Sequence, residues 1–113
     1  MQKSDIEYLK HIKKECDFIL LAIQNLDFNS FYESEVLKRA TTRAFEIIGE
    51  ASKNIFQDFR DLYPEIPWSF MARTRDKIIH HYFGVDYIIV WETIQNKIPE
   101  LQLKVENIIK EHS

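Results

Sequence analysis

Apolar positions recur every three or four residues along most of the 113-residue chain, which is the spacing of amphipathic helices. The first apolar stripe predicts a helix from about residue 5 to residue 25. Ser4 and Glu7 have the spacing of a capping box at its start. The polar segment Asn25 to Ser30 then predicts a turn. The expected buried positions of this helix are Ile6, Leu9, Ile12, Cys16, Ile19, Leu20 and Ile23.

A second stripe predicts a helix that begins at Ser30 or Ser34 and ends near Ile55. Gly49 lies in its middle, where a glycine costs about 1 kcal/mol relative to alanine. Since alanines on the same helix also present little bulk, we expect another backbone to approach closely at Gly49. The expected buried face is Ala40, Ala44, Ile47, Ile48, Ala51 and Ile55.

Prolines divide the next part of the chain. Pro64 and Pro67 are three residues apart, which no helix interior tolerates, so residues 56–67 are expected to be irregular. Pro67 can open a third helix, which we expect to run from about Trp68 to Phe83 and to end at Gly84.

Asp86 is the expected N-cap of a fourth helix, Tyr87 to about Asn96. Pro99 separates it from a short helix over residues 100–112. No segment predicts a strand or a repeat. The sequence therefore predicts a single domain over residues 1–113, an all-α up-down bundle of four main helices plus a short C-terminal helix.

Composition narrows the class of protein. Fifteen basic and 18 acidic residues give a net charge of −3, which argues against a broad electrostatic nucleic-acid binder but leaves room for a local basic pocket. The one cysteine cannot form an internal disulfide and favours a reducing compartment. No stretch approaches the ~18 apolar residues of a membrane span, and the N-terminus does not have a signal-peptide pattern. We expect a soluble cytoplasmic protein with no membrane contact.

Three residue types suited to phosphate chemistry form an Arg-x4-His-x-Tyr motif over residues 75–82. The Arg75 guanidinium can clamp a phosphate, the His80 imidazole can move protons near neutral pH, and the Tyr82 phenol can donate a hydrogen bond or accept a covalent modification. On one ideal helix Arg75 and Tyr82 share a face, whereas His80 lies about 140° round the axis. Either the backbone is distorted near Gly84, or a second copy of the chain completes the site in a two-fold symmetric dimer. A solvated helix face is the simpler interpretation of the motif alone.

The motif and three further blocks together resemble the HepT-like proteins of the HEPN superfamily, the toxin halves of HepT/MntA toxin–antitoxin pairs. The blocks, in chain order, are Ile47-Ile48-Gly49-Glu50-Ala51, Tyr63-Pro64-Glu65-Ile66-Pro67-Trp68, and Phe83-Gly84-Val85-Asp86 with Val90-Trp91. The resemblance covers nearly the whole chain.

The resemblance implies a metal-independent RNase toxin of a type VII-like HEPN/MNT toxin–antitoxin system, with its active cleft between two protomers of a homodimer. Arg75 and His80 match the family's catalytic pair. The ribose 2′-OH is the nucleophile, so no metal or other cofactor is implied. His80 would take the 2′-OH proton and protonate the departing 5′ oxygen, while Arg75 would hold the phosphate.

The resemblance also implies a partner, an MntA-like minimal nucleotidyltransferase antitoxin. In the family this enzyme transfers AMP to the motif tyrosine, which here is Tyr82. Such AMPylation would block the phosphate pocket by bulk and negative charge, and complex formation alone is a second mode of control. The implied substrate is RNA, with tRNA among the candidates.

Secondary candidates lie beside the motif. Glu50 and Arg43 share a face of the second helix and could orient Arg75 or His80 or contact substrate. The alternative is an ion pair, either within the helix or across a dimer contact. His81 is either a surface neighbour or a substrate contact. Cys16 lies on the apolar stripe of the first helix and is expected to be an inert core residue.

Two other functions compete with the nuclease. A carboxylate-bridged metal bundle would need Glu-x-x-His pairs, and the sequence contains none, so we expect no metal site. A non-catalytic dimeric HEPN adaptor that binds a nucleotidyltransferase or RNA is the stronger alternative. The complete motif favours the enzyme, because an adaptor has no need of His80.

Overall fold

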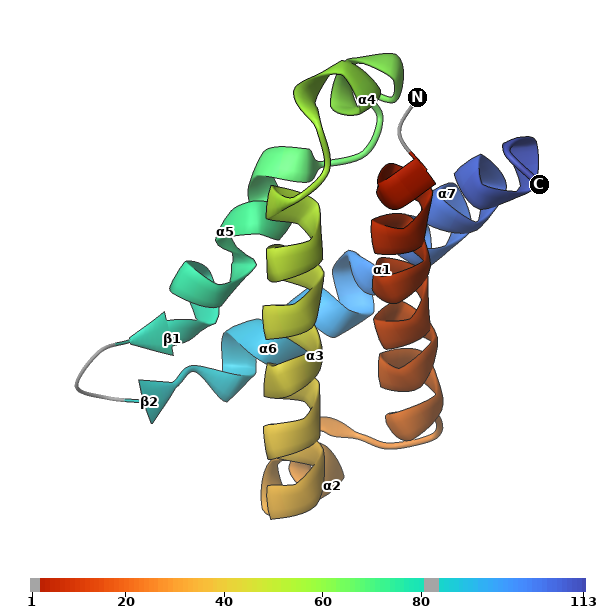
Figure 1. Cartoon of the computed structure of the whole chain (residues 1–113). Coiled ribbons are helices and arrows are strands. Elements are labelled where there is room, and N and C mark those ends of the chain that lie inside the picture. The colour runs from red at the N-terminus through yellow and green to blue at the C-terminus, as the bar shows by residue number, and fades with distance from the viewer. Residues whose placement is uncertain (1–2, 81–83) are drawn as a thin grey trace.

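The computed structural model describes residues 3–80 and 84–113, and over these residues the fold is all-α, as the periodicity predicts (Figure 1). Helices account for almost every element, and one pair of two-residue strands accompanies them. In chain order the elements are α1 (Lys3–Ala22), α2 (Phe28–Glu33), α3 (Glu35–Lys53), α4 (Gln57–Leu62), α5 (Trp68–Ile78), β1 (Ile79–His80), β2 (Gly84–Val85), α6 (Tyr87–Asn96) and α7 (Ile98–Glu111).

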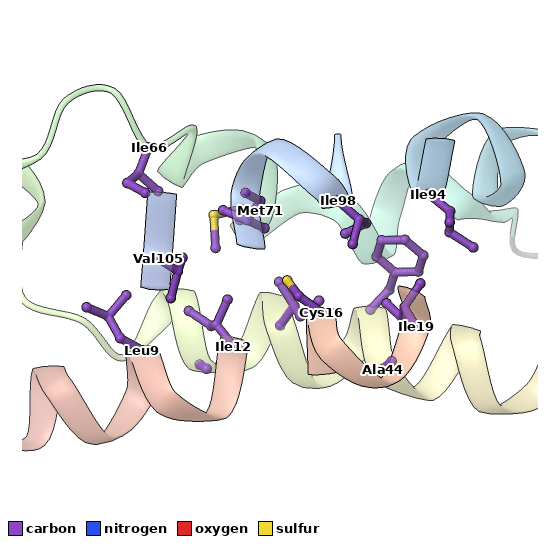
Figure 2. Packing of buried hydrophobic residues seen from close by; sticks show 14 of the residues in the cluster. Leu9, Ile12, Cys16, Ile19, Ala44, Ile66, Met71, Ile94, Ile98 and Val105 are labelled. Atoms are coloured by element: carbon purple, nitrogen blue, oxygen red, sulfur yellow. The ribbon is translucent and has the colours of Figure 1, made fainter. Parts of the chain in front are cut away.

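The core lies between α1, α3, α5 and α7. Helix α3 packs against both α1 and α5, and α1 packs also against α7 (Figure 1). Leu9, Ile12 and Cys16 on α1 are fully buried and point toward the side chains of α7 and α5, among them Val105 and Met71 (Figure 2). The apolar stripe predicted for the first helix is therefore the buried face, and removal of these side chains from water stabilises the bundle.

Ser34 is the N-cap of α3, so of the two predicted starts, Ser30 and Ser34, the second is correct. Its hydroxyl accepts a hydrogen bond from the backbone N–H of Leu37 at 3.1 Å, so it is the N-cap. The residues before it form the short helix α2, capped by Asp27, whose carboxylate accepts from the N–H of Ser30 at 2.8 Å. The predicted turn over residues 25–30 is therefore shorter than expected.

The segment expected to be irregular also contains a helix, α4. It ends at Leu62, before Tyr63 and Pro64, so the prolines still exclude helix where they stand. At the N-terminus α1 is already helical at Lys3, one residue before the predicted cap Ser4. Both differences concern helix ends or single helical turns.

The close approach predicted at Gly49 is present between α3 and α5. A β-carbon on Gly49 would lie 3.2 Å from the carbonyl oxygen of Met71 and 3.7 Å from that of Ala72. Gly49 therefore allows the two helix backbones to touch, and this contact sets the position of α5 on α3.

Helix α5 ends at Ile78, so the prediction that it continues to Phe83 is wrong. Strand β1 pairs antiparallel with β2, with Ile79 opposite Val85 and His80 opposite Gly84. Two causes favour this end. Ile78 and Ile79 are β-branched, which favours extended backbone, and the Ile78 carbonyl accepts from the N–H of Asp86 at 2.7 Å. The expectation that the chain has no strand fails at this hairpin.

The last two helices follow the prediction closely. The carboxylate of Asp86 accepts from the backbone N–H groups of Ile88 and Ile89, both at 3.1 Å, so Asp86 caps α6. Pro99 lies in the first turn of α7 and does not precede it. Of the helices in the described ranges, none is both long and apolar enough to cross a membrane.

Candidate active site

Arg75 lies in the last turn of α5 with about half of its side chain exposed. Its Nε is 3.6 Å from a carboxylate oxygen of Glu46 on α3, and its Nη1 is 3.9 Å from Asp76. The Glu46 side chain is 32% exposed and that of Asp76 is 77% exposed. Glu46 is therefore the partner that solvent screens less. One edge of the guanidinium faces Glu46, and other N–H donors remain for an anion.

Glu46 was not among the residues expected from the sequence. Glu50, four residues later on the same face of α3, was the expected carboxylate partner of Arg75 or His80. Position along α3 decides between them. Met71 of α5 lies against Gly49, so Arg75, one turn later on α5, comes beside Glu46, about one turn before Gly49 on α3. The sequence could narrow the partner to this face of α3 but could not choose the helical turn.

His80 is described as a residue of β1, opposite Gly84 in the hairpin. The helical relation that would separate Arg75 and His80 by about 140° does not apply, since the helix ends at Ile78 between them. The backbone therefore does depart from the helix, and does so before His80 and not only near Gly84. The predictions for His81 and Tyr82 fall on residues outside the described part of the chain.

Beside Arg75 is an open hollow of about 350 Å³, which we call the α1–α3–α5 hollow. It brings together three of the predicted site residues: Arg75, Arg43 and Glu50. The complete lining is Tyr8, His11, Arg43, Glu46, Ile47, Glu50, Ala51, Asn54 and Arg75. Tyr8 and His11 were not expected at the site, because nothing in their sequence neighbourhood indicates that α1 forms its wall.

An ion pair between Arg43 and Glu50 within the helix is not formed, and an ion pair across a dimer contact stays a prediction. Neither side chain makes an ion pair with any residue whose side chain the structure describes, although both line the same hollow. Both are exposed, which leaves one cation and one carboxylate available to a ligand.

Cys16 is separate from this site and is buried in the core, as predicted. Burial raises the pKa of its thiol to about 12, and the neighbouring carboxylates of Asp17 and Glu15 act in the same direction. Among the side chains that the structure describes, which do not include that of His80, no three His, Cys, Asp or Glu residues gather in a way that could hold a metal ion.

Comparison with known proteins identifies the family. The sequence profile described as "Ribonuclease HepT-like" matches residues 6–108. A protein of Caldanaerobacter subterraneus subsp. tengcongensis named "Putative RNase" is 45% identical over 108 residues, which is 96% of each chain. A protein of Thermococcus cleftensis named "Probable ribonuclease HepT" is 46% identical over 110 residues, 97% of this chain and 100% of that protein.

A third relative, named "Putative RNase" in Methanocaldococcus jannaschii, is 44% identical over 112 residues, 98% of this chain and 93% of that protein. No solved structure matches the chain. Because the profile and the relatives cover nearly all of the sequence, the chain belongs to the ribonuclease HepT-like family of HEPN proteins.

Proposed function

We propose that the protein is an RNase that cleaves RNA through the ribose 2′-OH, with Arg75 and His80 as its catalytic residues. One observation carries the proposal. Arg75 is exposed and paired with Glu46 at the end of α5, and the helix stops between it and His80. On a continuous helix the two residues would lie about 140° apart, and the end of the helix between them lifts that restriction. This supports their joint action on one phosphate in a chain of a ribonuclease family.

The chemistry needs one base, one acid and one anion clamp. His80 takes the proton of the 2′-OH, and the oxygen attacks the adjacent phosphorus. The bond from phosphorus to the 5′ oxygen breaks, a 2′,3′-cyclic phosphate forms, and an imidazolium donates its proton to the departing oxygen. Arg75 donates hydrogen bonds to the phosphate oxygens and stabilises the additional negative charge of the transition state.

Two copies of the chain supply these groups best. Each protomer has one His80, whereas the reaction uses a base and an acid in the same step. A two-fold axis beside α5 would place two copies of Arg75 and His80 along one cleft. The exposure of Arg75 supports this arrangement, because its guanidinium is accessible from outside the protomer.

The nuclease is controlled, in this proposal, by a minimal nucleotidyltransferase antitoxin that transfers AMP to Tyr82. Tyr82 follows His80 by two residues and Arg75 by seven. An adenylyl phosphate in this position would compete with RNA phosphate for Arg75 and repel the incoming chain. The protein would thus be the toxin of a toxin–antitoxin pair.

Cleavage assays on single variants test the nuclease. We expect purified wild-type protein to cleave total RNA or tRNA to products with 2′,3′-cyclic phosphate ends, and Arg75→Ala or His80→Ala to lower the rate about 10²–10⁴-fold. Arg39→Ala, an exposed arginine on α3 outside the hollow, is the matched control and should retain full activity. If wild type and His80→Ala are equally inactive on RNA and equally harmless on expression, the non-catalytic adaptor is the correct alternative.

Mass spectrometry tests the control mechanism. Co-expression with an MntA-like minimal nucleotidyltransferase should add one or more AMP units, localised to the peptide containing Tyr82. Tyr82→Phe should remain unmodified and active in the presence of the partner. Modification at another residue, or inhibition without any mass change, would contradict AMP transfer to Tyr82.

A further inference from the structure

We propose that the α1–α3–α5 hollow binds the nucleotide next to the scissile phosphate in single-stranded RNA. The inference rests on the proposed nuclease function, because Arg75 forms part of the hollow and is the residue assigned to that phosphate. It adds a binding site to the catalytic pair and names what that site holds.

The floor of the hollow is one face of α3. Arg43, Glu46, Glu50 and Asn54 are spaced by three or four residues, so their side chains follow one stripe along the helix. Further toward the N-terminus of α3 the charges neutralise one another, since Glu35 pairs with Lys38 at 3.0 Å. Along the hollow, Arg43 and Glu50 remain unpaired among the described residues.

The wall opposite Arg75 is formed by two rings of α1. The centroids of Tyr8 and His11 are 6.3 Å apart, and the planes meet at 88°. Tyr8 packs against the hydrophobic core, which holds its ring in place, whereas His11 is exposed. Rings at the edge of a nucleic-acid site serve as stacking surfaces for unpaired bases.

Each group then has a ligand atom that suits it. Arg75 holds the scissile phosphate, and Arg43 holds the neighbouring phosphate of the same strand. The Glu50 carboxylate can accept hydrogen bonds from amino or imino groups on a base edge. Because the two rings are perpendicular, the exposed His11 ring can stack on the face of that base while the Tyr8 ring borders its edge. A volume of about 350 Å³ suits one nucleotide and excludes a duplex, whose bases are stacked away from the protein.

The charge of the hollow also fits recognition of one nucleotide. Two arginines face two glutamates, so the hollow has no net attraction for a polyanion over long distances. Affinity must come from short contacts with an unstacked nucleotide. This agrees with the overall net charge of −3, which provides no general attraction for RNA.

Binding of an uncleavable oligonucleotide tests the inference without relying on catalysis. The probe is a fluorescein-labelled, single-stranded 2′-O-methyl RNA, and the measurement is its dissociation constant by fluorescence anisotropy at several salt concentrations. We expect Arg43→Ala to weaken binding about tenfold and to reduce the salt slope by about 0.7, the value of one single-strand phosphate contact. His11→Ala should weaken binding several-fold with no change in the slope, because it removes stacking and not charge.

Two further variants test base specificity and provide the control. Glu50→Gln should change the ranking of oligonucleotides that differ in a single base, while Arg39→Ala should leave affinity, slope and ranking as in wild type. Circular dichroism should be unchanged throughout, because Arg43, His11, Glu50 and Arg39 are exposed.

The outcomes separate this inference from the nuclease proposal. If Arg75→Ala abolishes cleavage but Arg43→Ala and His11→Ala bind the probe like Arg39→Ala, the nuclease stands and the hollow is not a nucleotide site. If the hollow variants lose probe binding but Arg75→Ala and His80→Ala cleave normally, the hollow binds RNA, but its place beside the scissile phosphate fails together with the catalytic assignment. If the hollow variants change only the monomer–dimer equilibrium in sedimentation, the hollow is a contact between copies and the inference is overturned.

Discussion

At the scale of residues, the exposed side chain of Arg75 on α5 is held by an ion pair with Glu46 on α3. An arginine at a helix end has many rotamers, and a pairing with Glu46 restricts them before substrate arrives. The pair itself adds little stability, since both partners are in contact with solvent and exposed pairs contribute about 0–1 kcal/mol. Its value is therefore expected in catalysis and not in folding.

Replacement of Glu46 by glutamine should reveal this division. Glu46→Gln keeps the shape of the side chain but removes its charge, so we expect kcat for RNA cleavage to fall about tenfold while KM changes little. Urea unfolding should shift by less than about 1 kcal/mol. Steady-state kinetics on a defined oligonucleotide provide the measurement.

The matched control is Glu35→Gln, which removes a paired carboxylate from the same helix away from the hollow. It should leave kcat unchanged. An equal kcat for wild type and Glu46→Gln would mean that Arg75 is placed correctly without its partner.

At the scale of elements, the contact between α3 and α5 determines where Arg75 lies. Gly49 is the position that permits it, because any β-carbon there would meet the Met71 carbonyl oxygen at 3.2 Å. The Glu46–Arg75 pair lies beyond this crossing point, one turn along each helix. A larger distance between α3 and α5 at Gly49 should therefore also move Arg75 away from Glu46.

Gly49→Val tests this contact. We expect a loss of about 1–3 kcal/mol in the free energy of unfolding, the usual cost of overfilling a tight contact, together with reduced RNA cleavage. Lys53→Val also places a valine on α3 but at an exposed position, and its lower helix propensity should cost less than about 0.7 kcal/mol. Equal unfolding midpoints for the two variants would show that α5 is not held against Gly49.

Helical periodicity predicted the long elements well and the short ones poorly. The stripes of α1 and α3 are several turns long, and most of their predicted inward positions are buried. A helix of six residues, such as α2 or α4, shows too few repeats for a period to be recognised. The end of α5 was missed for a different reason. Residues 78–83 continue an acceptable helical pattern, in which the β-branched Ile78 and Ile79 are only a weak signal for a strand. The hydrogen bond from the Asp86 N–H to the Ile78 carbonyl, which also favours the hairpin, cannot be seen in the sequence.

At the scale of the whole molecule, the candidate site combines three helices that are distant in sequence. The motif residue Arg75 could be identified from spacing and resemblance, but Glu46, Tyr8 and His11 could not. Their relation to Arg75 depends on how α1 and α5 flank α3, and no local pattern encodes that arrangement (Figure 1). The predicted dimer stays a prediction at this scale, since it concerns a second copy of the chain.

The buried thiol has a practical consequence for locating that second copy. Cys16 is the one cysteine in the sequence, and with a pKa raised to about 12 it holds almost none of the thiolate that reacts with maleimides at neutral pH. A cysteine introduced at an exposed position, such as Arg39→Cys, would be the one thiol that reacts with a spin label. Cys16 would not have to be replaced. If two copies pair as predicted, the two labels would give a single probe-to-probe separation, and without pairing they would give none.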